Sequence, residues 1–372
     1  MTKTAFGRHI KTKGLKKMKK LSLQIIVAAI IVLIVTNANT AVEYANRAID
    51  VCLGIIVPTL FPFFICSGLL IYSGFCESLA RMFRFCMKPL FNVGAMGASA
   101  FVIGIVSGYP LGAITAGELY KNSYITKTEA ERLLAFCNNS GPLFILGSVG
   151  VAMYSKISYG VMLYVCHILA AITVGVLFRF YKKNDYLAPK TVMTSPERNV
   201  GEIFSIALSN AISNMLTVCG AVLFFGVVSQ LVMSYLPLEG VMKAAASGIV
   251  EFVTGSIAVS GLDLPTAQKL IITAFIVGFA GLSVHIQVMA ATVKYELSLL
   301  PYIIGKIIHG AIAALYTFIY LSINPITSAV FMVSLDKSFS ASAAYSGVVV
   351  IICIIAILSV ELILPKEQKC IE

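Results

Sequence analysis

Charged residues are scarce in this sequence and tryptophan is missing, and together these shortages exclude an ordinary soluble protein. Charged residues make up 12% of the 372-residue chain and hydrophobic residues 58%, whereas a soluble domain carries about 25% charged residues. So few charges cannot cover the surface of a water-soluble fold. Without tryptophan, any aromatic belt at a membrane surface must come from the 16 tyrosines and 22 phenylalanines.

Sequence motifs for catalysis, metal binding and cofactor binding are also missing. The nine cysteines form no CxxC pair and have no zinc-like spacing with histidine. The sequence contains no HExxH, GxGxxG, GxSxG or phosphate-binding loop. We therefore expect a protein that is not an enzyme, with no catalytic residues, no bound metal and no cofactor. The cysteines are expected to pack as small apolar side chains.

Long apolar runs predict an all-α polytopic membrane protein, because a spanning helix needs about 20 mainly apolar residues. Clear candidate spans are 21–36, 51–73, Ile157–Phe178, 215–235, 301–322 and 346–364. Two apolar regions interrupted by Gly, Pro and Ser are predicted to form re-entrant hairpins, at 95–119 and 244–262. Two further regions are predicted to be broken transmembrane helices, at 130–154 and 268–292.

The distribution of basic residues predicts the orientation in the bilayer. With the lysine-rich tail inside, only five of the 28 Lys and Arg residues fall outside, namely Arg47, Lys156, Lys243, Lys269 and Lys337. This positive-inside bias places both termini in the cytoplasm. The tail and the run 21–36 also resemble a signal peptide, but an uncleaved signal anchor fits better with the many spans that follow. The net charge of +11 is explained by topology and does not indicate a nucleic-acid partner.

The two halves of the chain share an order of elements, which predicts an inverted-topology repeat. Gly104-Ile105-Val106 begins the first hairpin, and Gly248-Ile249-Val250 recurs in the second. Each hairpin is followed by a charged helix start, a broken helix and a span, and the charge count places the two hairpins on opposite sides. Many secondary transporters are built this way. The predicted segments are a basic cytoplasmic tail (1–20), the anchor with the first half (21–199), the inverted second half (200–322), and an outer loop, last helix and short cytoplasmic tail (323–372).

The first broken helix carries the most informative stretch of the sequence. Thr126 and Glu129 fit a capping box that starts a helix, and Asn-Asn-Ser-Gly-Pro at 138–142 interrupts it. Free N–H groups of the next half-helix would suit a carboxylate. We therefore predict substrate binding by Asn138, Asn139, Ser140 and Gly141. The alternative is a kink that serves packing alone.

Polar residues in the second broken helix and at the hairpin tips complete the predicted site. Ser283, His285 and Gln287 are predicted to bind substrate, although His285 and Gln287 converge only where the backbone opens near Gly281, and an interior packing role for His285 stays open. The predicted hairpin tips and gating residues are Gly108, Tyr109, Pro110, Gly255 and Glu251. Glu251 is a functional candidate because ionisable residues are costly inside a membrane. Lys306 and His309 lie one turn apart, and Lys306 is expected to snorkel to the cytoplasmic surface.

Four runs of this sequence resemble one known family. LFPFFICSGLL, GIVSGYPLGA, TEAERLLAFCNNSGPLFILGSVGV and GFAGLSVHIQV are similar to the sporulation integral membrane family called YlbJ or SpoVV. That family belongs to the nucleoside-recognition gate-domain group, which includes concentrative nucleoside transporters. The resemblance covers roughly 41–322 and is most specific at FCNNSGPLFILG.

This resemblance implies a transporter of dipicolinic acid, a small planar dicarboxylate. It would move the substrate from the mother-cell cytoplasm toward the forespore by alternating access, and it would lie in the outer forespore membrane. Two alternatives stay open: a gate-domain transporter of a nucleoside or other organic anion, and a non-transporting membrane factor in spore-envelope assembly. The expected partners are a small anionic molecule and the lipid bilayer. The sequence leaves the oligomeric state, the partner proteins and the driving force undetermined.

Overall fold

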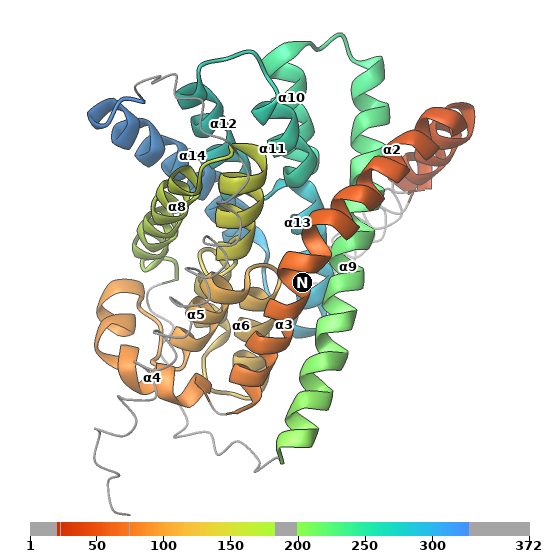
Figure 1. Ribbon diagram of the computed structural model, residues 1–372. Coiled ribbons are helices and arrows are strands. Elements are labelled where there is room, and N and C mark those ends of the chain that lie inside the picture. Colours follow the sequence, from red (N-terminus) through yellow and green to blue (C-terminus); the bar gives the residue numbers. More distant parts are fainter. Residues whose placement is uncertain (1–20, 23, 74, 183–198, 327–372) are drawn as a thin grey trace, which may run out of the picture.

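The computed structural model describes residues 21–182 and 199–326, apart from 23 and 74. This region of the chain is helical and contains no β-strand (Figure 1). Four of its helical stretches are long and apolar enough to cross a bilayer: α8 (Ile157–Phe178), α9 (Val200–Tyr235), the interrupted stretch Thr266–Tyr295 and α14 (Leu300–Ile323). The predicted all-α polytopic membrane fold is therefore confirmed. The basic tail, the predicted outer loop beyond 326 and the expected last span fall outside the described residues.

The helix predicted as an anchor at 21–36 is followed by a sharp corner and a further helix. The helix Gln24–Thr36 meets α2 (Ala38–Val51) at an angle of 97°. At this corner the Asn37 amide Nδ2 donates to the Leu33 carbonyl over 2.9 Å, and such bonds from a polar side chain back to the preceding turn favour bending. If the bent pair is one span, the described residues hold up to five spans.

Helix α2 was not predicted, because its charged residues looked like a loop. Its polarity is instead that of an amphipathic helix: Glu43 and Arg47 pair on the exposed face at 2.6 Å, while Ala41 and Ala48 are buried. The chain continues through a π-helical turn into α3, so the span predicted at 51–73 is the second segment of a single long helical run. The bounds of these two elements are η1 (Cys52–Ile56) and α3 (Val57–Tyr72).

Beyond α3 the two halves of the chain follow the same order of hairpin, broken helix and span. The first half contains α4 (Phe75–Cys86), η2 (Met87–Phe91), α5 (Gly97–Ser107), α6 (Leu111–Lys121), α7 (Lys127–Leu134), η3 (Phe144–Met153) and α8. The second contains α9, α10 (Gly240–Val250), α11 (Phe252–Ser260), α12 (Thr266–Phe279), α13 (Gly281–Thr292), η4 (Val293–Tyr295) and α14. Figure 1 shows the α5–α6 hairpin in the lower half of the molecule and the α10–α11 hairpin in the upper half. The inverted repeat stays a prediction, with which this arrangement agrees.

The halves are joined by close helix packing. Helix α14 packs against α8 and α12, and α3 packs against α9. Within the second half, small residues also allow α12 and α14 to approach closely: a Cβ on Gly278 of α12 would lie 2.7 Å from the Cα of Gly310 in α14. Glycine at such crossings is typical of membrane helices, where backbones approach closely.

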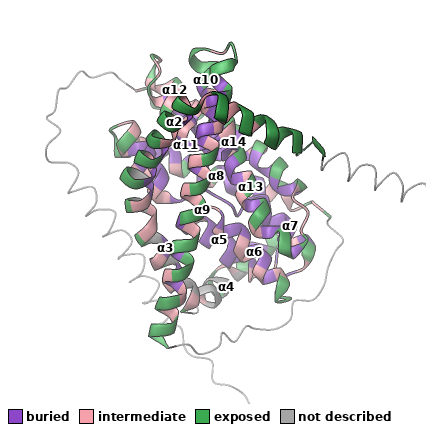
Figure 2. Ribbon diagram, turned by 90° about the vertical axis from the view of Figure 1, so that its right-hand side faces the viewer, coloured by how far each residue is buried: buried purple, intermediate pink, exposed green. Residues whose placement is uncertain are grey.

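Apolar side chains cover the outer surface as well as the core. Along α8, Ile157, Val161, Val165 and Leu169 repeat every four residues and are all exposed, while the opposite face of the helix is buried. Figure 2 shows the same division, with buried residues inside and exposed residues along the outer faces of α2, α3 and α9. A continuous exposed apolar stripe of this kind suits contact with lipid.

The first hairpin turns where the sequence predicts, at Gly108 with a φ of +80°. Its two helices lie close together and enclose the Cys137 carbonyl oxygen. A Cβ would lie 1.6 Å from that oxygen at Gly104 and 2.1 Å from it at Gly112. The glycines of this hairpin therefore bring it into direct contact with the first broken helix.

The second hairpin turns at a different residue from the one predicted. The turn is at Glu251, whose backbone is extended and whose Oε2 accepts the Thr254 N–H over 2.6 Å to cap α11. Gly255 lies inside α11, where a Cβ would lie 2.0 Å from the Cα of Gly248. The prediction of Gly255 as the tip was wrong because this glycine allows two helices to pack closely and does not form the turn.

Candidate functional site

The two hairpin tips and the two helix breaks meet in the interior of the protein. A Cβ on Gly108 would lie 2.8 Å from the Gly141 nitrogen, so the first tip touches the first break. A Cβ on Gly281 would lie 3.0 Å from the Phe252 nitrogen, so the second break touches the start of α11. The two tips touch each other through the rings of Tyr109 and Phe252, whose centroids are 5.4 Å apart.

The first break lies where the sequence predicts. The capping box of Thr126 and Glu129 starts α7, and residues 138–141 are non-helical and buried between α7 and η3. Asn139 Nδ2 donates to the Phe136 carbonyl over 2.9 Å. The Ser140 N–H donates to His167 Nε2 over 3.1 Å. The half-helix that follows is π-helical over ten residues, a winding that is rare and often found at functional sites.

The second break lies at Ala280 and Gly281, which both have left-handed backbone conformations with φ of +73° and +67°. A non-glycine residue rarely adopts this conformation, because it costs roughly 1–2 kcal/mol. His285 Nδ1 is 2.7 Å from the Gly281 carbonyl, and its ring centroid is 5.0 Å from that of Tyr302. Ser283 is fully buried beside the break. Ser283 and His285, which the sequence predicts beside the second break, therefore both lie there.

Gln287 is not brought to the break. Helix α13 is regular from Gly281 onward, so Gln287 lies six residues along it, roughly 9 Å away. It is half-buried and makes no hydrogen bond with another described residue. The backbone opens only at Ala280 and Gly281, before the regular helix that carries both His285 and Gln287, so these two side chains are not turned to the same face.

Lys306 belongs to this site, and the prediction that it snorkels to the surface was wrong. Its side chain is only 1% exposed. Its Nζ donates to the Asn138 carbonyl over 3.1 Å and lies 3.2 Å from His309 Nδ1. The cause is the packing of α14 at the preceding residue, where a Cβ on Gly305 would lie 2.4 Å from the Ala135 carbonyl oxygen. This contact holds Lys306 against the first break and away from lipid headgroups.

Two histidines extend the site into α8 and α14. His309 Nε2 donates to the His167 carbonyl over 2.9 Å, and the two rings are 4.3 Å apart. Sequence reasoning passed over His167 because it stands alone in an apolar span. The sequence did contain a signal: placing an ionisable residue inside a membrane helix costs free energy, so such a residue is a functional candidate by default. Three of the four histidines in the chain lie at this site: His167, His285 and His309.

Polar side-chain atoms without a hydrogen-bond partner gather around the meeting point. Among the described residues, such buried atoms belong to Tyr109, Asn138, Asn139, Ser140, His167, Glu251, Ser283, His285 and Tyr302, and also to Ser148 and Thr317. Proteins normally satisfy the large majority of their buried polar groups. Some of these side chains do face one another, as Tyr109 faces Ser140, without reaching hydrogen-bond geometry. Their concentration here indicates a surface that is built for polar contacts.

The ionisable groups of the site are one amine, one carboxylate and three imidazoles. Glu251 and Lys306 are both fully buried, yet no ion pair joins them. One oxygen of Glu251 caps α11 and the other has no partner. The amine lies at the first break and the carboxylate at the second tip, so the site has a basic end and an acidic end.

The conformation of the described structure is closed around these groups. The tips are in ring contact, and Phe144 of η3 also packs on Phe252 with centroids 5.0 Å apart. A cavity that borders His167, between η3, α8, α12 and α14, measures about 10 Å³, which is room for no more than one water. Entry of an organic molecule would therefore require the tips to separate.

Comparison with known proteins identifies a relative. The chain is 29% identical over 322 aligned positions to the sporulation integral membrane protein YlbJ of Bacillus subtilis strain 168. The alignment covers 77% of this chain and 79% of that protein. The resemblance to the YlbJ family that the sequence indicates is therefore confirmed. No family model matches it, and no solved structure matches it.

The similarity to this integral membrane protein agrees with the helices described above: the chain is an integral, multi-pass membrane protein. The wider gate-domain grouping, which the resemblance implies, stays an expectation. The location of each site residue rests on the geometry of this chain alone.

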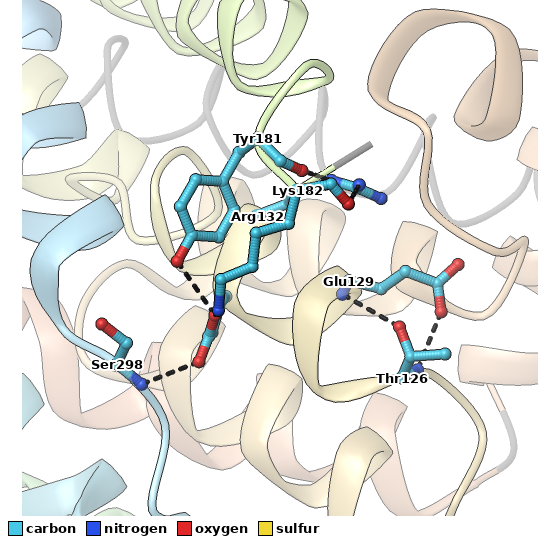
Figure 3. A network of polar contacts seen from close by, with 7 residues as sticks. Thr126, Glu129, Arg132, Tyr181, Lys182 and Ser298 are labelled. Carbon is cyan, nitrogen blue, oxygen red and sulfur yellow. Dashed lines mark hydrogen bonds and ion pairs between the residues drawn. The ribbon is translucent and has the colours of Figure 1, made fainter. Parts of the chain in front are cut away.

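A second buried network lies along α7, apart from the hairpin tips (Figure 3). Glu131, 1% exposed, accepts the Ser298 N–H over 3.1 Å and pairs with Lys182 at 2.9 Å. The hydrogen bond with the Glu131 carboxylate raises the pKa of Lys182. The adjacent Arg132 donates to three carbonyls, those of Asn92, Tyr181 and Lys182, over 2.7 to 2.8 Å. The network ties the end of α8 and the approach to α14 to the first broken helix.

Proposed function

We propose that this chain is a membrane transporter that moves dipicolinate, a small dicarboxylate, from the mother-cell cytoplasm toward the forespore during sporulation. The observation that carries the proposal is the meeting of two hairpin tips and two helix breaks around buried, unpartnered polar groups. Interrupted helices at membrane depth are tolerated only where they are buried or line a cavity, and transporters place their substrates at such breaks. A purely scaffolding membrane protein has no need for them.

The chemistry of the site favours an anion with a planar ring. The half-helix that begins after the first break points its amino terminus into the site, and this end carries a partial positive charge. Lys306 supplies a buried amine beside it. The rings of Tyr109, Phe144 and Phe252 form an aromatic cluster at the tips, and aromatic faces pack well on flat rings.

Support for a role in sporulation comes from the relatives of the chain. The curated relative is named a sporulation integral membrane protein, and the family resemblance of the sequence implies dipicolinate and the outer forespore membrane. The physical features above support a carboxylate, while the identity of that carboxylate rests on the resemblance.

The transport mechanism that fits this architecture is alternating access. The two halves repeat the same order of elements, and their hairpins approach the centre from opposite sides of the molecule (Figure 1). Rocking of one half against the other would separate one hairpin tip from the neighbouring helix break while the other tip stays in contact. The site would then be exposed to one side of the membrane only. The closed structure would then be the occluded intermediate between the two open forms.

Uptake into proteoliposomes tests the proposal directly. Purified protein is reconstituted, and the uptake of radiolabelled dipicolinate is compared with that of uridine and adenosine, with protein-free liposomes as the control. Saturable uptake of dipicolinate is expected. Uptake of nucleosides alone would establish the nucleoside alternative, and uptake of neither substrate in either direction would favour the non-transporting alternative.

A spore-forming host gives an independent test in the cell. A strain that lacks this gene should synthesise dipicolinate in the mother cell and fail to deposit it in the spore. Dipicolinate is measured in separated mother-cell and spore fractions, with the complemented strain as control. Normal dipicolinate in the spores of a mutant without a second transporter would refute the proposal.

A further inference from the structure

Lys306 is a buried amine for which the described region of the protein supplies no carboxylate. Its side chain is 1% exposed, and it takes part in no ion pair among the described residues. Its two hydrogen bonds are with the Asn138 carbonyl and with His309 Nδ1, and its Nζ lies 5.8 Å from the centroid of the Tyr109 ring. An ammonium group has three donors, so one of them has no nitrogen or oxygen acceptor among the described residues. Buried charges are normally paired.

The hydrogen bonds around Lys306 fix which groups are donors. Because Lys306 donates to His309 Nδ1, the proton of His309 is on Nε2, which donates to the His167 carbonyl. Because His167 Nε2 accepts the Ser140 N–H, the proton of neutral His167 is on Nδ1. That Nδ1 and the Ser140 hydroxyl are both buried without a partner. The first break therefore presents an amine, an imidazole N–H and a hydroxyl as free donors.

We propose that Lys306 is the residue that makes the site selective for charged substrates, by pairing with a carboxylate of the substrate at the first break. This inference rests on the proposed transport function and assigns the residue that recognises the charge. A carboxylate offers two acceptor oxygens, which match an ammonium together with a neutral donor such as His167 Nδ1 or the Ser140 hydroxyl. A nucleoside carries no such charge and would leave the buried amine unpaired.

The test compares a charged and an uncharged form of the same ring. Binding to purified protein in detergent, and uptake into liposomes, are measured for pyridine-2,6-dicarboxylate and for its neutral diamide. Three variants are used: Lys306→Gln, Lys306→Arg and, as a matched control, Lys269→Gln. Lys269 also donates to backbone carbonyls, those of Ser260 and Leu262 at the end of the second hairpin, but it lies away from the breaks.

Lys306→Gln should weaken binding of the dicarboxylate roughly 10- to 100-fold, as expected for a lost charge-assisted hydrogen bond. Its affinity for the diamide should be unchanged or higher. Lys306→Arg should keep the preference for the dicarboxylate, and Lys269→Gln should leave both affinities as in the wild type. If Lys306 had a merely structural role, Lys306→Gln would change the affinities for the dicarboxylate and for the diamide by the same factor. That result would overturn the inference.

The outcomes separate this inference from the function on which it rests. A wild-type protein that neither binds nor transports the dicarboxylate would refute the proposed function. Wild-type transport with an unaltered charge preference in Lys306→Gln would refute the role of Lys306 alone. Should Lys306→Gln fail to accumulate, Lys306→Met and Lys306→Arg decide the matter, because only the arginine variant should retain the preference for the charged ligand.

Discussion

Arg132 is the largest side chain that is fully buried in the described structure, and replacing it should destabilise the protein strongly. Its guanidinium donates to the carbonyls of Asn92, Tyr181 and Lys182. These carbonyls belong to segments 40 to 50 residues away along the chain. Figure 3 shows Arg132 reaching the end of the α8 segment from the start of the first broken helix.

The magnitude follows from the three bonds. A hydrogen bond with a charged partner contributes about 1.5–3 kcal/mol. Tyr181 is half-buried and Lys182 is exposed, so water can partly replace two of the three bonds, and the lower end of that range applies. Arg132→Met should therefore cost about 3–5 kcal/mol. Arg132→Lys keeps the charge but loses the planar fork, and should cost about half as much.

Thermal unfolding in detergent, followed by fluorescence-detected size exclusion, measures the effect. A loss of this size corresponds to a fall in Tm of roughly 5–15 °C. Arg81→Met is the matched control, because Arg81 is exposed on α4 and its bond to a described side chain, Ser78 at 3.4 Å, is long. Equal Tm values for Arg132→Met and Arg81→Met would refute the reasoning, since they would mean that the carbonyl bonds contribute nothing.

Three further experiments address the site and the packing. Asn139→Leu and Ser140→Leu should abolish transport in proteoliposomes while the protein still inserts and accumulates, and unchanged kinetics in both would move the site elsewhere. Glu251→Gln should keep the cap on Thr254, because the amide oxygen can still accept that N–H, and should remove any pH dependence of transport; a wild-type pH profile would restrict Glu251 to capping. Oxidation with copper phenanthroline should form a disulfide between Cys52 and Cys219, because the Cys52 Sγ lies 3.9 Å from the Cys219 carbonyl oxygen. The reagent accepts the two electrons, and each thiol loses its proton. Mass spectrometry detects the link, with Cys219→Ser as control, and its absence would contradict the packing of α9 on η1.

The features of the fold that the sequence predicted are those with strong local signals. The capping box of Thr126 and Glu129, the polar interruption at 138–142 and the turn at Gly108 all depend on residues adjacent in the chain. The second tip was misplaced because two local signals competed. Thr254-Gly255-Ser256 has the composition of a turn. Glycine is needed at 255, however, because any side chain there would collide with the backbone of Gly248 on the neighbouring helix, a contact that the linear sequence does not display.

Helix α2, which follows the corner at Asn37, was missed for a related reason. Residues 38–51 contain Glu43, Arg47 and Asp50, and counted along the chain they resemble a polar loop. Placed on a helix, Glu43 and Arg47 share one face and pair with each other. Periodicity, and not composition alone, distinguishes an amphipathic helix from a loop.

Lys306 shows most clearly why the site could be predicted only incompletely. A lysine near the start of a span, six residues after the span's start at Leu300, normally reaches the membrane surface, because its stem is long enough to snorkel. Whether it does so depends on what stands beside it in space. Here Gly305 allows α14 to approach Ala135 so closely that the neighbouring lysine is enclosed by the broken helix.

The sequence nevertheless contains a physical clue to this location. Lys306 and His309 are one turn apart, and His167 lies in a separate span, so three costly ionisable residues occur in segments that must pack together if the halves repeat. Each residue alone has an ordinary explanation, whereas a shared location reduces the cost of all three through mutual hydrogen bonds. For chains of this kind, the pairing of helices implied by an internal repeat should be applied to isolated polar residues before they are assigned to the surface. It would have placed Lys306 beside the predicted carboxylate site from the sequence alone.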